Sequence, residues 1–396
     1  MISFEEAFQN VLDHPLNLGN EQVTLLQSTG RILAEVIKAD RDFPPFDRST
    51  KDGIAIHFSA IEQGNDRFKI VGTLSAGMAQ QTLSSDANCF EIMTGAVLPK
   101  AADTIVMYEE TAIKDGWAIL SKTPKKGQNI HRQGSDEKAG AVLLEKGRKI
   151  TAAVIGVLAS VGKTEVLVKK LPKVCVVSTG NELVEVSETP LPHQIRKSNM
   201  LSLTAALEKI KIFPTQLHLA DDRTVVEKKL QKALAEFDVL MLSGGVSKGK
   251  FDFIPDALEA LGVEKIFHRV SQRPGKPFWF GIQIAHKKVV FSFPGNPVST
   301  FANYHVYFLP WLSKTLGIEM EKQHVILDET VQPQSNLTLF LQVRTERRKG
   351  KLLAKLVQGN GSGDLVSLAK TDGFICVPAG ETEIAKGNAF ELISCV

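Results

Sequence analysis

Residues 238–252 read DVLMLSGGVSKGKFD, a short apolar strand that runs into two glycines, a basic turn and a carboxylate. A strand that ends in Gly-Gly lets the backbone approach a ligand closely, and the N–H groups beyond it can hold oxyanions. The stretch therefore predicts an anion site at the end of a buried strand.

One interpretation of this stretch is a nucleotide-binding P-loop. Gly244, Gly249 and Lys250 fit the pattern G-x-x-x-x-G-K-[ST], but Phe251 stands where the Mg²⁺-binding hydroxyl belongs. Asp252 adds a carboxylate that the pattern does not require. Phosphoryl transfer needs the missing hydroxyl as a metal ligand, which disfavours this interpretation.

Strand and helix patterns alternate around this stretch. Helical patterns at 200–210 and 225–237 separate short apolar runs, as expected for a parallel sheet with crossover helices. Ligands of such sheets bind at the carboxyl ends of the strands. The motifs STGNEL, ADD, SGGVSKGKFD and FPGNPVS each follow one run, which predicts a single site at one sheet edge. The four runs are Val174–Ser178, Gln216–Leu219, Val239–Leu242 and Val289–Phe293.

The flanking regions have different patterns. Ser3 and Glu6 form a capping box that predicts a short N-terminal helix, and a second helical pattern covers 151–161. Gly-rich, β-leaning sequence extends from 23 to about 147. The later patterns are a helix at 298–316 and a hairpin at 337–344 and 351–357, which belongs to a final all-β domain.

Composition narrows the functional classes. A chain of 396 residues is long enough for two to four domains. A formal net charge of +3 makes nucleic acid an unfavourable main partner. The four cysteines are scattered without a C-x-x-C pair, which argues against a zinc site or a disulfide framework. No apolar run approaches the length of a membrane span, so we expect a cytoplasmic protein without a membrane partner.

Several segments, taken in order, resemble the molybdopterin molybdenumtransferases, the family of bacterial MoeA and the gephyrin E domain. SGGVSKGKFD is similar to the family signature GGVSxGxxD. The similarity extends from about Pro44 to Ser299, and the C-terminal part looks like the small β domain of the family. The other matching segments are PPFDRSTKDGIAI, EIMTGAVLPKAADTIVMYEE, STGNEL, ADD, RPGKPFWFG and FPGNPVS.

The resemblance implies an enzyme that inserts molybdate into adenylylated molybdopterin. Mg²⁺-dependent hydrolysis of the anhydride would release molybdenum cofactor and AMP. A homodimer with shared active sites is also implied, in which the loop of Asp52 and Thr94 faces the α/β domain of the other subunit. The implied partners are molybdopterin adenylyltransferase and apo-molybdoenzymes.

The implied fold is a multidomain α/β protein. Its central parallel α/β sheet domain, of the molybdopterin-binding type, is expected at 171–318. A β-rich domain at 23–139 is inserted into a small helical, elongated stalk domain formed by 1–22 and 140–170. A small β-barrel domain at 319–396 completes the expected organisation.

The catalytic residues implied by the resemblance come from both the inserted domain and the α/β domain. Three of them follow successive strands and are the expected Mg²⁺ ligands, because hard carboxylate oxygens suit this ion. Ordinary roles compete with these assignments, since an Asp-Gly pair often forms a turn and either member of the Asp221-Asp222 doublet can cap a helix. We expect Asp221 as the cap and Asp222 as the ligand, and the doublet leaves this choice open. The catalytic set is Asp52, Thr94, Glu182, Asp222 and Asp252, and the metal set is Glu182, Asp222 and Asp252.

Cofactor and molybdate binding is assigned to stiff, Gly- and Pro-rich loops. In RPGKP, Arg273 and Lys276 place two cations on a loop whose prolines reduce the entropy cost of ordering them. An ordinary solvated surface loop is the alternative interpretation. The resemblance assigns binding to Gly244, Gly245, Ser247, Gly249, Arg273, Lys276, Pro294, Pro297, Arg344 and Ser362.

Two departures from the family pattern and two other functions stay open. The family has methionine and an aromatic residue where this chain has Lys51 and Ile54, beside Asp52. A molybdopterin adenylyltransferase-like enzyme would resemble only the middle of the chain, and a non-catalytic scaffold of the gephyrin type would need a partner groove. The preference for molybdate or tungstate and the recipient apoenzyme cannot be read from the sequence.

Overall fold

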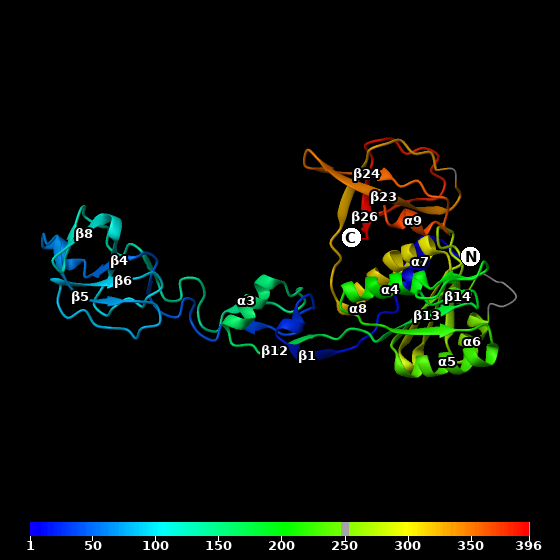
Figure 1. Ribbon diagram of the computed structural model, residues 1–396, viewed down its shortest axis with the longest axis horizontal. Coiled ribbons are helices and arrows are strands. Elements are labelled where there is room, and N and C mark those ends of the chain that lie inside the picture. Colours follow the sequence, from blue (N-terminus) through cyan, green and yellow to red (C-terminus); the bar gives the residue numbers. More distant parts are fainter. Residues whose placement is uncertain (247–252, 334, 396) are drawn as a thin grey trace. The chain divides into compact units, whose positions relative to one another are not determined.

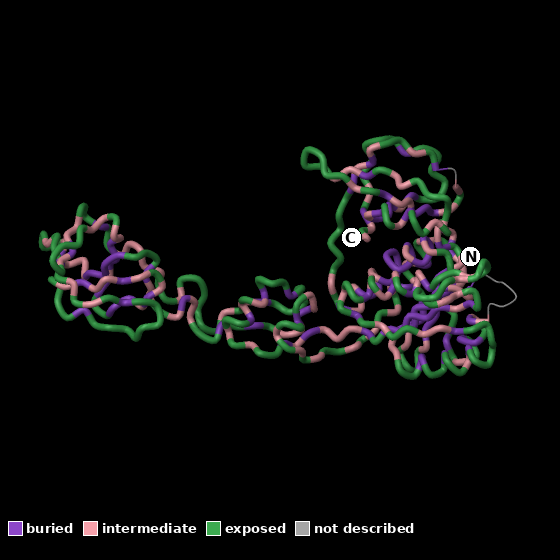
Figure 2. The backbone as a smooth tube through the Cα atoms, in the orientation of Figure 1, coloured by how far each residue is buried: buried purple, intermediate pink, exposed green. Residues whose placement is uncertain are grey.

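The computed structural model describes residues 1–246, 253–333 and 335–395. The chain forms two compact units, which are described separately below. Unit 1 contains 1–34, 147–151 and 166–396, and unit 2 contains 35–146 and 152–165. Buried residues concentrate inside each unit, as Figure 2 shows in purple.

A mixed six-stranded sheet forms the centre of unit 1. Its order is β16-β13-β17-β21-β20-β18, and the first four strands are parallel with continuous registers. These four correspond to the predicted apolar runs. Two further strands extend the sheet in an antiparallel hairpin pairing that the sequence patterns did not predict. The bounds are β13 Val174–Thr179, β16 Thr215–Leu219, β17 Val239–Ser243, β18 Glu264–His268, β20 Trp279–Gln283 and β21 Lys288–Phe293.

Helices cover both faces of this sheet (Figure 1), and its central strand β17 is completely buried. Alternate residues of β17 belong to opposite hydrophobic clusters, with Val239 and Met241 on one face and Leu240 and Leu242 on the other. Strands buried on both faces read as continuous apolar runs, as the sequence does here. The first face is covered by α4 (Ser198–Lys209), α7 (Pro297–Asn303) and α8 (Leu309–Leu316), and the second by α5 (Arg223–Glu236) and α6 (Ile254–Ala260).

The N-terminal helix α1 (Phe4–Leu12) packs on this α/β core. As predicted, the Ser3 hydroxyl caps it by accepting a hydrogen bond from the Glu6 N–H at 3.1 Å. Phe4 lies edge-on to Phe340 at a ring distance of 5.1 Å, within the cluster that also contains α8. The amphipathic face of α1 is buried in unit 1, which also contains residues 147–151 and 166–170.

A closed five-stranded barrel forms the C-terminal part of unit 1. The strands pair in the order β23-β24-β22-β26-β25, and a further pairing of β25 with β23 closes the ring. The predicted hairpin at 337–344 and 351–357 is therefore present, and it is longer than expected. The bounds are β22 Gln323–Leu327, β23 Thr338–Arg348, β24 Lys351–Leu356, β25 Gly373–Val377 and β26 Ala389–Ser394.

Unit 2 contains a second six-stranded sheet, ordered β7-β4-β6-β5-β9-β8. Its two faces have separate apolar clusters, one around Ile105 and one around Val106. The predicted helix at 151–161 is α3 (Ala152–Ser160), also in unit 2. The strand bounds are β4 Gly53–Ile56, β5 Arg67–Leu74, β6 Asn88–Ile92, β7 Thr104–Met107, β8 Thr111–Lys114 and β9 Trp117–Leu120.

The predicted fold class, a multidomain α/β protein with a β-rich insertion and a C-terminal barrel, is confirmed by these elements. The four proposed domain boundaries stay a prediction. In the described part of the chain, no helix combines the length and apolarity that a membrane crossing requires.

Candidate functional site

A cavity of about 1000 Å³ opens at the carboxyl ends of the parallel strands in unit 1. It is lined by the residues that follow β13, β16, β17 and β21, as the strand topology predicted. A small two-stranded flap, formed by β14 (Leu183–Val184) and β15 (Ile195–Arg196), supplies another wall. The N-terminus of α4 also borders the cavity through Ser198 and Asn199, where free N–H groups and the helix dipole favour an anion.

The double glycine after β17 lies directly in the cavity wall. Gly244 and Gly245 have φ angles of 101° and 73°, which disfavour residues with a Cβ atom. A Cβ on Gly245 would lie 2.7 Å from Ile254 Cγ1, and one on Gly244 would lie 2.9 Å from Thr179 Oγ1. The glycines are therefore required both by the turn and by close packing.

Several expectations for this loop lie outside the described residues. They include the binding roles of Ser247 and Gly249 and the carboxylate of Asp252. Lys250 and Phe251, on which the P-loop interpretation depends, also lie outside the described residues.

Two carboxylates that line the cavity come from the ends of β13 and β16. Glu182 folds back against Gly180, where an added Cβ would meet its Oε2 at 2.3 Å. Asp221 exchanges two hydrogen bonds with Asn181, each 3.2 Å long. These bonds hold the loops after the two strands together and place Asp221 in the wall.

The neighbouring Asp222 has a different role from the one expected. It is the N-cap of α5, and its carboxylate accepts a hydrogen bond from the Val225 N–H at 2.9 Å. The expected cap was Asp221, and this is wrong, because the cap is Asp222 while Asp221 lines the cavity. Which of the two is a metal ligand stays a prediction.

The described residues fit a Mg²⁺ ion in the kind of donor that they offer. Mg²⁺ is usually held by one or two carboxylates, with water and ligand phosphate oxygens completing an octahedron. Glu182 and Asp221 provide two such carboxylates in the cavity. Within the described ranges, no group of three acidic, His or Cys side chains is close enough to hold a metal ion.

The FPGNP loop after β21 is held in place by Asn199. Its side-chain amide donates to the Gly295 carbonyl at 2.6 Å and to the Ser243 hydroxyl at 3.0 Å. The loop is closed by Thr300, whose hydroxyl donates to the Pro294 carbonyl at 2.5 Å. Pro294 and Pro297, both predicted as binding residues, line the cavity.

The barrel contributes to the same wall through one loop. The Ser362 hydroxyl accepts a hydrogen bond from the Asn296 amide at 2.8 Å, and its carbonyl accepts from the Val298 N–H at 3.1 Å. The adjacent Gly363 and Leu365 line the cavity. Arg344 lies exposed on β23 and is not among the described residues that line it.

The cations of the RPGKP loop, Arg273 and Lys276, are exposed and lie outside the cavity lining, although the next residue, Pro277, belongs to it. The loop is anchored from below by buried Gln272, whose amide donates to the Pro274 carbonyl at 3.0 Å and to Asn303 Oδ1 at 2.9 Å. These hydrogen bonds fix the backbone at the base of the loop that carries Arg273 and Lys276.

Asp52 and Thr94 meet each other in unit 2. Asp52 Oδ1 accepts hydrogen bonds from the Thr94 N–H at 2.6 Å and from the Thr94 hydroxyl at 2.7 Å. These two bonds lower the pKa of the Asp52 carboxyl below its usual value. Of the two departures from the family pattern, Lys51 is exposed, whereas Ile54 is fully buried in the core of the sheet.

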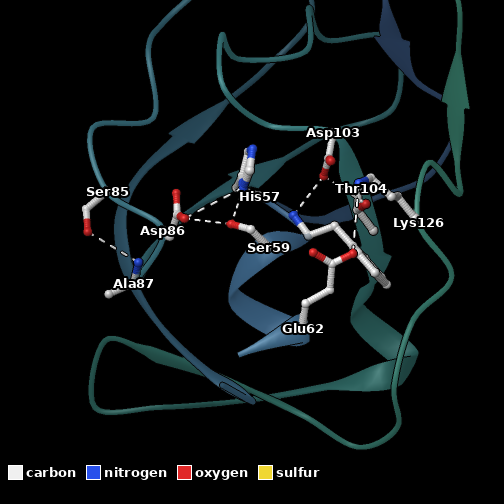
Figure 3. Close-up of polar contacts among 10 residues, drawn as sticks. His57, Ser59, Glu62, Ser85, Asp86, Ala87, Asp103, Thr104 and Lys126 are labelled. Atoms are coloured by element: carbon white, nitrogen blue, oxygen red, sulfur yellow. Dashed lines mark hydrogen bonds and ion pairs between the residues drawn. The ribbon is translucent and has the colours of Figure 1, made fainter. Parts of the chain in front are cut away.

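A second polar cluster in unit 2 contains a Ser, a His and an Asp (Figure 3). The Ser59 hydroxyl donates to Asp86 at 2.6 Å, while His57 Nδ1 lies 2.5 Å from the same hydroxyl. A serine nucleophile needs its proton directed to the histidine, with the carboxylate behind the ring. Here the Ser59 hydroxyl donates its hydrogen bond to the carboxylate of Asp86 and not to the histidine, so the cluster connects the turn of Ser59 to the loop of Asp86.

Comparisons with known proteins extend over almost the entire chain. Residues 2–162 match the MoeA N-terminal region (domain I and II), 175–314 a probable molybdopterin binding domain, and 324–394 the MoeA C-terminal region (domain IV). A molybdopterin molybdenumtransferase of Synechocystis is 38% identical over 394 residues, covering 98% of this chain and 99% of the relative. This chain belongs to the molybdopterin molybdenumtransferase family.

Other relatives agree with this assignment to the molybdenumtransferase family. A molybdopterin molybdenumtransferase of Staphylococcus epidermidis is 31% identical over 99% of this chain and 95% of its own length. A crystal structure of the MoeA protein from Pyrococcus horikosii superposes with a TM-score of 0.83 at 30% identity, covering 99% of this chain and 98% of that chain. The chain is thus a molybdenumtransferase-class enzyme of molybdenum cofactor biosynthesis.

Sequence reasoning did not identify three residues of this molybdenumtransferase cavity as contributors. Asp221 was expected as the helix cap, with its role as a ligand left open, and no sequence pattern pointed to Asn199 or Lys197. The segment QIRKSN, which immediately precedes a helical pattern, was the available signal for the last two, because residues at a helix N-terminus lie near strand-end ligands.

Proposed function

We propose that this enzyme inserts molybdenum from molybdate into adenylylated molybdopterin. Hydrolysis of the phosphoanhydride and transfer of molybdenum to the dithiolene would release AMP and molybdenum cofactor. The observation that carries this proposal is the cavity of about 1000 Å³ at the strand ends, which is large enough for a nucleotide-sized ligand. No protein nucleophile is required, because the reaction depends on orientation and on neutralisation of phosphate charge.

Glu182 and Asp221 are the described residues that would hold Mg²⁺ in this cavity, with Asp252 as a further expected ligand. When bound, the ion would supply charge neutralisation at the phosphates. The protein itself would orient the ligand through the N–H groups at the start of α4 and the glycine turn after β17. Molybdate is proposed to enter at the RPGKP loop, where Arg273 and Lys276 are exposed cations on an anchored backbone.

The Asp221-Asp222 doublet provides a test with an internal control. Asp221→Asn keeps an acceptor for the Asn181 N–H but removes a cavity charge, so we expect activity to fall with little change in stability. Asp222→Ala removes the α5 cap and should cost about 1 kcal/mol of stability while leaving most activity. Reconstitution of an apo-molybdoenzyme and chemical denaturation measure the two effects. Full activity of Asp221→Asn would contradict the proposed site.

A homodimer with shared active sites is part of the proposal. Asp52, oriented by Thr94, would act on the ligand held by the α/β domain of the other subunit. Apo-molybdoenzymes and molybdopterin adenylyltransferase are the proposed partners, and a cytoplasmic location suits this role.

The two alternative functions have less support. An adenylyltransferase-like enzyme would account only for the middle of the chain, whereas the family matches also cover 2–162 and 324–394. A gephyrin-type scaffold requires a groove for a partner, and the large cavity in the described residues is instead lined by strand-end loops with charged groups.

A further inference from the structure

Lys197 is a buried cation in the wall of the cavity. It immediately precedes α4, and its side chain is only 8% exposed although lysine is rarely buried. Its backbone is fixed, because its N–H donates to the Val184 carbonyl of the flap at 3.1 Å. The position of the lysine is therefore set by the fold at both the helix start and the flap.

The partner of the buried ammonium is a carboxylate that faces water. Lys197 Nζ forms an ion pair with Glu185 Oε1, and the Glu185 side chain is 56% exposed. A buried ammonium needs a counter-ion. The Glu185 carboxylate is already largely hydrated, so it can move away from Lys197 into water if another anion takes its place. Another anion could therefore replace Glu185 as the partner of Lys197.

The charge of the cavity wall makes this cation important. Among the described residues that line the cavity, the acidic side chains are Glu182 and Asp221 and the basic ones are Arg196 and Lys197. Arg196 uses its Nε to donate to the carbonyls of Val186 and Glu188, at 3.0 and 3.1 Å, and so braces the flap. Lys197 is the buried basic group of this described lining, whereas Arg196 is exposed to solvent.

The charge of Lys197 also acts on His218, a histidine bonded to the cavity wall. The pKa of His218 is lowered by burial and then by the nearby Lys197 and Lys229 charges. His218 Nδ1 lies 3.0 Å from the hydroxyl of Ser178, which itself lines the cavity. Lys197 and Ser178 both line the cavity, so the positive charge of Lys197 lies in the wall of the proposed ligand site.

We propose that Lys197 binds a phosphate group of the ligand in this cavity and exchanges the Glu185 carboxylate for phosphate oxygens when it does so. This inference rests on the proposed function, which supplies a phosphate-bearing ligand. Lys197 is a binding residue in this view, and Glu185 is the counter-ion that the phosphate replaces. If the ion pair served only to clamp the flap, the lysine would have no preference for phosphorylated ligands.

Titration calorimetry with AMP and adenosine separates these two roles. Lys197→Met should weaken AMP binding by about 10- to 100-fold, the range for a hydrogen bond to a charged group, and leave adenosine binding unchanged. Glu185→Gln should tighten AMP binding, because the competing carboxylate charge is removed. Lys228→Met, an exposed α5 lysine outside the cavity lining, is the matched control and should bind both as the wild type does. Thermal melts verify that the variants are folded.

The outcomes are distinguishable. Equal weakening of AMP and adenosine in Lys197→Met, or unchanged AMP binding, would overturn the inference. If the wild type bound no AMP, the proposed nucleotide substrate would fail, and the same series with pyrophosphate would decide the role of Lys197. Pyrophosphate binding that is lost in Lys197→Met would uphold the lysine, and no anion binding at all would reject both proposals.

Discussion

Asp52 is stabilised in its charged form by one neighbour that acts twice. Thr94 donates both its backbone N–H and its hydroxyl to the same carboxylate oxygen. Because the pKa of Asp52 is lowered in the folded protein, its contribution to stability is present above the usual Asp pKa. That contribution is lost as the pH falls through the lowered value. The carboxylate is thereby kept ionised and oriented at neutral pH.

Thr94→Val tests the hydroxyl's share of this effect. We expect the pKa of Asp52 to rise part of the way towards its usual value, since the N–H bond remains. An NMR titration of the Asp52 carboxyl measures the change. Thr73→Val is the control, because the Thr73 hydroxyl donates to Glu91 instead, at 3.0 Å. An unchanged Asp52 pKa in Thr94→Val would show that the hydroxyl bond contributes nothing.

The roles of some single residues could not be predicted from the sequence. The sequence predicted that one carboxylate of the Asp221-Asp222 doublet caps a helix, but not which one. Both can accept a hydrogen bond from a backbone N–H, and a shift of the helix start by one residue would exchange their roles. Lys197 escaped prediction because its burial depends on a flap that returns from the end of β13. Gly244, Gly245, Pro294 and Pro297 line the cavity, and the sequence could point to them because their backbone constraints are local, although their binding roles stay predictions.

The glycine turn after β17 is an element whose geometry can be tested. Gly245→Ala would force a Cβ into the left-handed region and to within 2.7 Å of Ile254, so we expect a stability loss of about 2 to 3 kcal/mol. Gly380→Ala, also at positive φ but with open space around it, should lose only about 1 kcal/mol. Chemical denaturation of both variants gives the difference, and equal losses would rule out the packing contribution.

The π-helical turn η4 (Tyr304–Phe308) joins α7 to α8 and buries His305. Burial lowers the pKa of His305 to about 4, while its Nδ1 lies 2.9 Å from the Phe301 carbonyl. The unfolded chain takes up the proton at a higher pH, so the folded state loses stability as the pH falls from about 6.5 towards 4.

This pH dependence gives a measurable prediction for the η4 turn. Between pH 8 and pH 5, we expect His305 to account for about 2 kcal/mol of lost stability. His305→Gln should remove that slope from denaturant curves, while His286→Gln at an exposed position should retain it. A wild-type slope in His305→Gln would mean that the histidine is protonated equally in both states.

Elements were predicted from the sequence more reliably than their partners. The four parallel strands, the helices between them and the barrel hairpin were expected, because apolar periodicity is a local property. The antiparallel pairing of β18 and β20 was not, since pairing is decided by contacts between distant segments. The N-terminal helix was predicted from its capping box, yet its burial beside Phe340 depends on a residue more than 300 positions away, beyond any sequence pattern.

At the scale of the whole molecule, the proposed sharing of sites between subunits can be tested by mixing. Asp52→Ala and Asp221→Asn proteins should each have reduced activity alone, because each lacks one carboxylate. After subunit exchange, a heterodimer would contain one site with both carboxylates, and part of the activity should return. Exchange is verified with differently tagged subunits. No recovery after verified exchange would place both residues at a site within one chain.

The hydrogen bonds between Ser362 and the FPGNP loop have a consequence for synthesis of the protein. The cavity wall includes Gly363 and Leu365, which are synthesised late. Helix α1 is synthesised first, but its contact with Phe340 can form only after residue 340 has been made. A ribosome-bound chain that has released only the α/β strands would expose the α1 face and hold an incomplete cavity. A chain that ends before Ser362 would therefore lack both the hydrogen bonds to the FPGNP loop and the part of the cavity wall formed by Gly363 and Leu365.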